Sequence, residues 1–178
     1  MSLSHTILTL LAESPYSGYD LNKHFEDAVS CFWKASHQQI YRELSKMASL
    51  GWVQSEAIPQ QGKPDKKLYQ ITDIGLQELH DWFELPCTPT QIREDMLVKV
   101  LAGEYIPRAI LIQHLQSRRS RHQAQLDCYL EQEQAFLDLE HPPDRLRFRY
   151  FTLRRGLRYE AEWVEWCTEV LDAIEPKV

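Results

Sequence analysis

The sequence predicts a mainly α-helical protein that contains one small β-hairpin and is divided into two parts. Three observations support this fold class. Apolar residues recur at helical spacing in both halves of the 178-residue chain. Two strand-like segments, 52–58 and 66–71, flank a turn rich in proline and glycine. The segment Pro86-Cys-Thr-Pro89 then interrupts the pattern and is typical of a linker.

Two helices are expected before residue 30. The first carries a stripe of four apolar residues, Ile7, Leu8, Leu10 and Leu11. Ser14-Pro15 ends it, because the residue before a proline avoids helical backbone angles. The second helix begins at a capping-box pattern, Ser17-Gly-Tyr-Asp20. Its apolar residues follow at helical spacing at Leu21, Phe25 and Ala28.

The third helix, within residues 36–50, is bounded at both ends by recognisable signals. Ser36-His-Gln-Gln39 is a capping-box pattern, with serine at the N-cap and glutamine three residues later. Gly51 stands where a glycine commonly terminates a helix. Three residues at spacing i, i+4, i+7 predict the buried stripe: Ile40, Leu44 and Met47.

A fourth helix is expected after the hairpin, with Thr72 as its N-cap. Its inward residues are predicted to be Leu76, Leu79 and Phe83. The expected order of elements in residues 1–85 is therefore helix, helix, helix, hairpin, helix. This is the order of a winged helix-turn-helix DNA-binding domain. Residues 86–92 are predicted to be a linker.

Residues 93–178 show no strand pattern and are predicted to form an all-helical dimerisation domain. A short helix over 93–102 is expected to turn four residues inward, Met96, Leu97, Val100 and Leu101. Two long helices should follow, from Pro107 to about Leu139 and from Asp144 to Ile174. The second has an apolar stripe near 3.5-residue spacing, interrupted by Glu160. An antiparallel pair of such helices cannot bury its own stripes, so we expect a homodimer through these helices.

The predicted third helix and hairpin carry residue types that bind DNA. Glutamine can pair in two places with adenine, and arginine can do so with guanine, while tyrosine and lysine commonly contact phosphates. The candidate contacts on the helix are Gln38, Gln39, Tyr41, Arg42 and Lys46. Those in the hairpin are Lys63, Lys66 and Lys67. The alternative for both segments is an ordinary solvated surface.

The net charge of −6 at first argues against nucleic acid, because strong non-specific binders are basic. The charge is unevenly distributed, however. Residues 34–67 carry six lysines or arginines against three acids, whereas residues 1–33 carry one lysine against four acids. Cations thus gather where a DNA contact would need them. A winged-helix protein-interaction module without DNA binding remains the competing hypothesis, and the net acidity is its best support.

Six segments of the first 85 residues have a specific order and spacing. They are Ile7-Leu8-x-Leu10-Leu11, Pro15-Tyr-Ser-Gly18-Tyr19-Asp20-Leu21, Trp33-x-x-Ser36, Ile40-Tyr41-x-x-Leu44, Leu50-Gly51-Trp52-Val53 and Leu68-Tyr69-Gln70-Ile71-Thr72-x-x-Gly75. In this order they resemble the PadR family of bacterial transcriptional regulators. The helical second half, with Tyr159-Glu-Ala-Glu-Trp163 near its end, is similar to the C-terminal region of AphA-like virulence activators.

The resemblance implies a homodimeric repressor or activator, and we expect a repressor. Because a dimer places two copies of the third helix in successive major grooves, its double-stranded DNA operator is expected to be an inverted repeat. The resemblance also implies a small-molecule effector, phenolic or otherwise aromatic. Many family members carry glycine near position 38 and proline at position 42, where this chain has Gln38 and Arg42. Its operator sequence is therefore expected to differ from the family's common sites.

Four aromatic residues are candidates for lining an effector pocket: Tyr19, Trp33, Trp82 and Tyr105. Their alternative is packing in the core. The arginine-rich segment 145–158 has three alternatives: pairing with acids of the preceding helix, a pocket for an anionic effector, or contact with phosphates. The acids expected to pair with it are Glu131, Glu133, Asp138 and Glu140.

The remaining composition points away from other classes of protein. The cysteines are far apart and are expected to be buried or half-buried reduced thiols: Cys31, Cys87, Cys128 and Cys167. No metal-site spacing, glycine-rich phosphate loop or local catalytic grouping is present, so we expect no cofactor, no metal and no enzymatic activity. No apolar window is long enough to span a membrane and the N-terminus lacks a signal-peptide pattern, so we expect a cytoplasmic protein.

Overall fold

The structure, a computed structural model, describes residues 3–29, 32–59 and 66–175. The chain divides into two compact units, Met1–Pro89 and Thr90–Val178. The described part is mainly helical, with one small antiparallel sheet, which confirms the predicted fold class.

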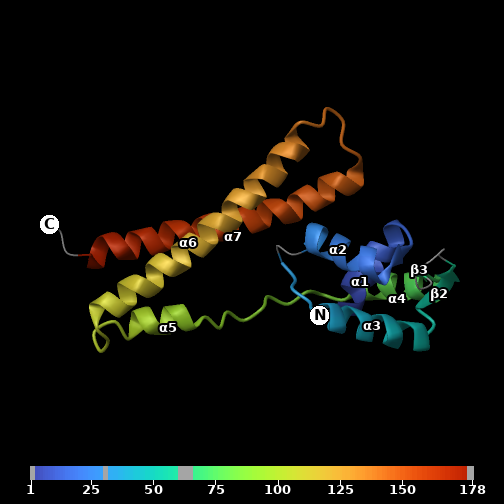
Figure 1. The fold of residues 1–178 in the computed structure, drawn as a ribbon, viewed down its shortest axis with the longest axis horizontal. Coiled ribbons are helices and arrows are strands. Elements are labelled where there is room, and N and C mark those ends of the chain that lie inside the picture. Colours follow the sequence, from blue (N-terminus) through green and yellow to red (C-terminus); the bar gives the residue numbers. More distant parts are fainter. Residues whose placement is uncertain (1–2, 30–31, 60–65, 176–178) are drawn as a thin grey trace. The chain divides into compact units, whose positions relative to one another are not determined.

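The first unit follows the predicted winged helix-turn-helix order (Figure 1). Its elements are α1 (Leu3–Glu13), β1 (Tyr16–Ser17), α2 (Gly18–Val29), α3 (His37–Ser49), β2 (Val53–Ile58), β3 (Lys66–Ile71) and α4 (Asp73–Glu84). The hairpin turn predicted between the two long strands falls largely on residues 60–65, which lie outside the described part of the chain.

The sheet has the strand order β1-β3-β2, and both pairings are antiparallel. In the hairpin, Val53 pairs with Ile71 and Ile58 with Lys66. The two-residue strand β1 was not predicted, because two residues are too few to show an alternating pattern. Its Ser17 pairs with Leu68, which brings the start of α2 next to the returning strand of the wing.

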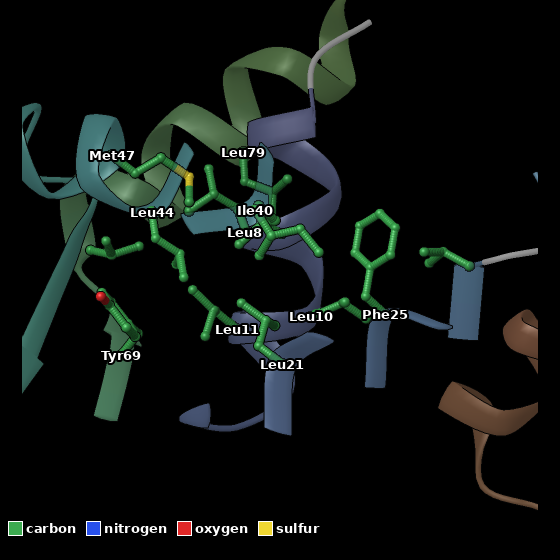
Figure 2. Close-up of a cluster of buried hydrophobic side chains, with 13 residues drawn as sticks. Leu8, Leu10, Leu11, Leu21, Phe25, Ile40, Leu44, Met47, Tyr69 and Leu79 are labelled. Carbon is green, nitrogen blue, oxygen red and sulfur yellow. The ribbon is translucent and has the colours of Figure 1, made fainter. Parts of the chain in front are cut away.

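Helix α1 lies in the middle of the first unit's core (Figure 2). Its residues Ile7 and Leu8 are completely buried, and they pack with the inward stripe of α3. The α3 stripe is the predicted one: Ile40, Leu44 and Met47 are at most 1% exposed. One face of α3 is therefore fixed against the core, and the opposite face must point to solvent.

The inward face of α4 differs from the prediction by one residue. Leu79 is buried as predicted, but Leu76 and Phe83 are exposed. The stripe that packs inward consists of Gly75, Leu79 and Trp82. The cap sets this rotation, because Thr72 Oγ1 donates a hydrogen bond to the backbone oxygen of Gly51 and accepts one from the Gly75 amide. Gly75 is thereby pressed against the backbone oxygen of Trp52.

The second unit contains α5 (Asp95–Leu101), α6 (Arg108–Leu137) and α7 (Asp144–Ile174) (Figure 1). The two long helices pack against each other and their bounds are close to those predicted, except that Pro107 is the N-cap of α6. The core of the second unit consists of Met96 of α5 together with Leu111, Leu115, Cys167 and Leu171 of the long helices.

The inward face of helix α5 is narrower than predicted, because only two of the four residues expected to point inward do so. Met96 and Val100 pack on the long helices, whereas Leu97 and Leu101 are exposed, Leu101 at 85%. Met96 and Leu97 are neighbouring apolar residues, and so are Val100 and Leu101. Periodicity alone therefore could not show which member of each pair packs inward. Further apolar residues are exposed on the long helices, among them Leu130, Phe148 and Phe151.

Candidate nucleic-acid interface

Helix α3 begins with a complete capping box. The Gln39 amide donates to Ser36 Oγ at 3.3 Å, and the Ser36 amide donates to Gln39 Oε1 at 2.8 Å. At the other end Gly51 has a φ of 73°, a left-handed conformation that favours glycine. The capping box uses Gln39 Oε1 and leaves its Nε2 group as a donor, and the DNA contact of Gln39 stays a prediction.

The exposed face of α3 carries Gln38, Arg42 and Ser45, opposite the buried stripe. Ser45 Oγ donates to the backbone oxygen of Tyr41 at 3.0 Å, so its hydroxyl is partly used within the helix. Within the described part of the chain, no hydrogen bond or ion pair engages Gln38 or Arg42. These two long polar side chains point away from the core as predicted, and their contact with DNA stays a prediction.

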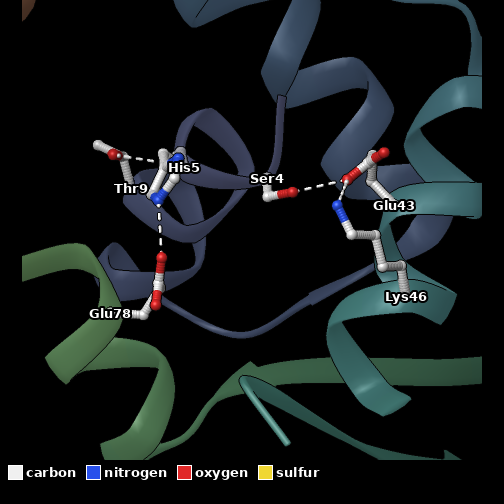
Figure 3. Close-up of polar contacts among 6 residues, drawn as sticks. All are labelled: Ser4, His5, Thr9, Glu43, Lys46 and Glu78. Carbon is white, nitrogen blue, oxygen red and sulfur yellow. Dashed lines mark hydrogen bonds and ion pairs between the residues drawn. The ribbon is translucent and has the colours of Figure 1, made fainter. Parts of the chain in front are cut away.

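Lys46, also predicted to contact DNA, is held by an acid of its own helix (Figure 3). Its Nζ lies 3.7 Å from Glu43 Oε2, and the same oxygen accepts a hydrogen bond from Ser4 Oγ of α1 at 2.6 Å. Glu43 therefore links α3 to α1 while it partly neutralises Lys46.

Tyr41 reaches from α3 toward the start of α2. A Cβ placed on Gly18 would lie 2.4 Å from a Tyr41 ring carbon, so the glycine leaves room for the ring. Tyr41 is nevertheless 44% exposed. Its predicted phosphate contact is compatible with this position, because phenolic oxygens commonly contact the DNA backbone.

The wing lysines differ in their surroundings. Lys66 Nζ lies 2.8 Å from Asp20 Oδ2, at the start of α2. Lys67 is exposed, and its ammonium lies 5.3 Å from the centre of the Tyr69 ring. Lys63 lies outside the described residues.

Sequence reasoning missed the acids that accompany the predicted cations. Asp20 was interpreted only as a capping residue, and Glu43 was counted only as a charge. The i, i+3 spacing of Glu43 and Lys46 could have revealed the second pair. Nothing in the sequence indicated the first, because Asp20 meets Lys66 only through the pairing of β1 with β3.

The four candidate effector residues do not share one environment. Trp33 and Trp82 are half-buried and pack against the first unit's core, where Trp82 stacks on His5 at a ring separation of 4.7 Å. Tyr19 and Tyr105 are exposed, at 72% and 84%. Their role in an effector site stays a prediction.

The second unit contains a buried polar pair that the sequence did not reveal. Glu160, predicted to interrupt the apolar stripe, is 8% exposed and accepts a short hydrogen bond from His122 of α6. The His122 ring stacks on Trp163 at 5.1 Å, and the Arg118 guanidinium lies 5.0 Å from the same ring. The polar pair thus connects the two long helices at a largely buried position.

The arginine-rich segment makes ion pairs with nearby acids. Arg154 Nε lies 3.7 Å from Glu133 Oε1, one of the four acids predicted to pair with it, and Arg147 lies 3.2 Å from Asp144. An open groove of about 480 Å³ lies elsewhere on the second unit. It is lined by side chains of both long helices, including Arg119, Gln123, Asp127, Val164 and Thr168.

Two of the cysteines are more exposed than predicted, and a third is buried as predicted. Cys87 and Cys128 are exposed and free, Cys167 is buried and free, and Cys31 lies outside the described residues. Burial raises the pKa of the Cys167 thiol. Within residues 3–29, 32–59 and 66–175, no group of three or more His, Cys, Asp or Glu side chains could hold a metal ion. None of the helices described is long and apolar enough to cross a membrane.

Comparison with known proteins identifies both halves of the chain. Residues 7–81 match the transcriptional regulator PadR-like family, and residues 92–175 match the C-terminal region of virulence activators. A probable transcriptional regulator of Mycobacterium tuberculosis is 34% identical over 99% of this chain and 100% of that protein.

Solved structures agree over nearly the whole chain. Bacillus subtilis PadR in complex with operator DNA matches with a TM-score of 0.83 and 29% identity, over 97% of this chain and 99% of that one. The same protein in complex with p-coumaric acid matches with a TM-score of 0.78 at 27% identity, over 98% and 99% of the two chains. The Vibrio cholerae virulence activator AphA matches with a TM-score of 0.82 and 32% identity over 97% of each chain. The winged helix-turn-helix, the C-terminal helical hairpin and these full-length relatives together show that the chain belongs to the PadR-like family of transcriptional regulators, with an AphA-like C-terminal domain.

Proposed function

We propose that this regulator binds a double-stranded DNA operator as a homodimer, with α3 in the major groove and the β2–β3 wing against the backbone, and that it acts as a repressor. The observation that carries the proposal is the exposed face of α3, where Gln38 and Arg42 have no partner among the described residues. Glutamine and arginine are the side chains that pair in two places with adenine and guanine. The relative solved with operator DNA supports the same assignment.

The proposed dimer forms through the C-terminal helices. Exposed apolar side chains such as Leu130, Phe148 and Phe151 would be covered in such an assembly. A twofold dimer presents two copies of α3, so the proposed operator is an inverted repeat whose half-sites lie about 34 Å apart.

The test is a fluorescence-anisotropy titration of the purified protein with its own promoter fragment. Arg42→Ala should weaken specific binding by roughly 1–3 kcal/mol if Arg42 contacts a base. Arg93→Ala removes the same charge from an exposed position before α5 and serves as the matched control. If the two variants bind the promoter fragment with equal affinity, Arg42 does not contact a base as proposed.

The same titration separates DNA binding from the competing protein-interaction module. The module is favoured by the net charge of −6 and by the acids that partner Lys46 and Lys66. A DNA-binding protein should lose affinity as salt rises, because phosphate contacts release counterions. A wild-type protein that binds neither the promoter nor unrelated DNA at low salt would favour the module.

The proposal includes a phenolic or other aromatic effector, supported by the relative solved with p-coumaric acid. Among the candidate residues, Tyr19 and Tyr105 have side chains exposed enough to meet a ligand. We expect p-coumaric acid to release the labelled promoter fragment from the protein. Unchanged anisotropy up to millimolar ligand would exclude this compound as the effector.

A further inference from the structure

Two adjacent lysines of the wing, Lys66 and Lys67, differ in how much of their positive charge is available to a ligand. Lys66 opens strand β3, and its ammonium is 2.8 Å from the Asp20 carboxylate. Lys67, on the opposite face of the strand, has no carboxylate partner among the described residues and lies only near the Tyr69 ring. A phosphate that approaches Lys66 therefore meets a pair with no net charge, whereas one that approaches Lys67 meets a cation.

Asp20 is held beside Lys66 by the local backbone. The Ser17 hydroxyl donates to Asp20 Oδ2 at 2.7 Å, and the Asp20 amide donates back to Ser17 Oγ at 3.1 Å. Ser17 is itself paired with Leu68 of β3, two residues beyond Lys66. The carboxylate also lies in the first turn of α2, where the helix dipole favours a negative charge. Its position therefore does not depend on Lys66 alone.

The Asp20 carboxylate is charged throughout the neutral pH range. The hydrogen bond from Lys66, followed by that from Ser17, holds the pKa of Asp20 below its ordinary value of 3.8. The pair is only partly exposed, with 38% of the Lys66 side chain and 44% of the Asp20 side chain accessible. A phosphate can therefore reach the ammonium, but only in competition with a fixed carboxylate.

We propose that Asp20 is an electrostatic restraint on DNA binding, which keeps Lys66 from acting as a full phosphate contact. This inference rests on the proposed function and adds a residue that sets how strongly the protein holds DNA of any sequence. Non-specific binding is almost entirely electrostatic and competes with the operator at a very large number of genomic sites. When Lys66 contributes less to phosphate binding, non-specific DNA competes less strongly with the operator. The exposed face of α3 is unchanged.

The test measures binding of an unrelated 24-base-pair duplex by fluorescence anisotropy across a series of sodium chloride concentrations. Asp20→Asn removes the charge but keeps an oxygen that can accept from Ser17. We expect it to raise affinity at low salt by roughly two- to five-fold, the range of an exposed ion pair. The slope of log affinity against log salt should also become steeper, by up to about 0.9.

The matched control is Glu84→Gln, which removes the same charge from the exposed last residue of α4, a position away from the proposed DNA contacts and with no cation partner among the described residues. It should leave the slope unchanged. The double variant Asp20→Asn/Lys66→Gln should lose the gain of the single variant. If Asp20→Asn and Glu84→Gln behave alike, or if the double variant keeps the gain, Asp20 is not a restraint on Lys66.

Two lysine variants keep the test decisive even if Asp20→Asn fails to fold. Lys67→Gln should flatten the salt slope by up to about 0.9, whereas Lys66→Gln should flatten it by less than half as much. Equal effects would overturn the inference while leaving DNA binding intact. A wild-type protein without salt-dependent DNA binding would instead overturn the proposed function itself.

Discussion

Gly75 shows how a single residue positions the recognition helix. A Cβ at this position would lie 2.1 Å from the Trp52 backbone oxygen, and backbone cannot move aside as a flexible side chain can. The same oxygen accepts a hydrogen bond from the Thr72 amide. The end of α3, the start of β2 and the start of α4 therefore meet at a point that only glycine fits.

Gly75→Ala should consequently destabilise the protein by about 1–3 kcal/mol, because the added methyl group must push α4 from the sheet. Urea unfolding followed by circular dichroism measures this loss. His80→Ala changes an exposed residue of the same helix and should cost less than about 0.5 kcal/mol. Similar losses for both variants would show that the close approach to Trp52 carries no cost.

The His122–Glu160 pair is the corresponding feature of the second unit. The two side chains are 13% and 11% exposed, so removal of the histidine leaves a carboxylate largely buried without its partner. We expect His122→Leu to destabilise the protein by roughly 3 kcal/mol. The double variant His122→Leu/Glu160→Leu should recover most of that stability, because a well-packed apolar pair can replace a buried polar one. A double variant as unstable as the single one would contradict this account in thermal unfolding.

At the scale of elements, the capping box determines where helix α3 begins. Ser36→Ala removes the acceptor of the Gln39 amide and should cost about 0.5–2 kcal/mol in urea unfolding. Ser49→Ala, at the exposed last residue of the same helix, should have less than about 0.5 kcal/mol of effect. If the two serines prove equivalent, the box does not stabilise the start of α3.

Elements were predictable where several signals agree. Capping residues, an apolar stripe and a terminal glycine all define α3, and proline breaks define α7. Strand β1 was missed because it exists only through its partner β3. The predicted inward face of α4 was rotated by one residue and that of α5 was too wide, since Leu76 and Leu97 are as apolar as the residues that pack.

The candidate site was predictable to the same extent. The reading face of α3 follows from its buried stripe, so Gln38 and Arg42 could be named from periodicity. The partners of the cations could not, because tertiary structure brings Asp20 to Lys66 and Ser4 to Glu43. Sequence therefore identified the types of side chain at the interface but not how much of their charge is available.

At the scale of the whole molecule, the proposed dimer constrains the operator. In analytical ultracentrifugation at micromolar concentration, a dimer should show twice the 21.0 kDa mass of the chain. Insertion of about five base pairs between the half-sites would turn them to opposite faces of the duplex, so affinity should fall toward that of a single half-site. Insertion of a full turn, about ten base pairs, keeps the two on one face and is the control. A monomer in sedimentation, or equal affinity for all spacings, would contradict the dimeric model.

The contacts of α1 bear on how an effector could act on the first unit. Ser4 of α1 bonds to Glu43 of α3, His5 bonds to Glu78 of α4, and Ile7 and Leu8 fill the space between them (Figures 2 and 3). A helix fixed to both neighbours in this way leaves α3 few internal degrees of freedom. We therefore expect the DNA-binding unit to move as a rigid body. An allosteric signal would then change the distance and orientation between the two copies of α3 in the dimer, while the surface that each copy presents to a base pair stays constant.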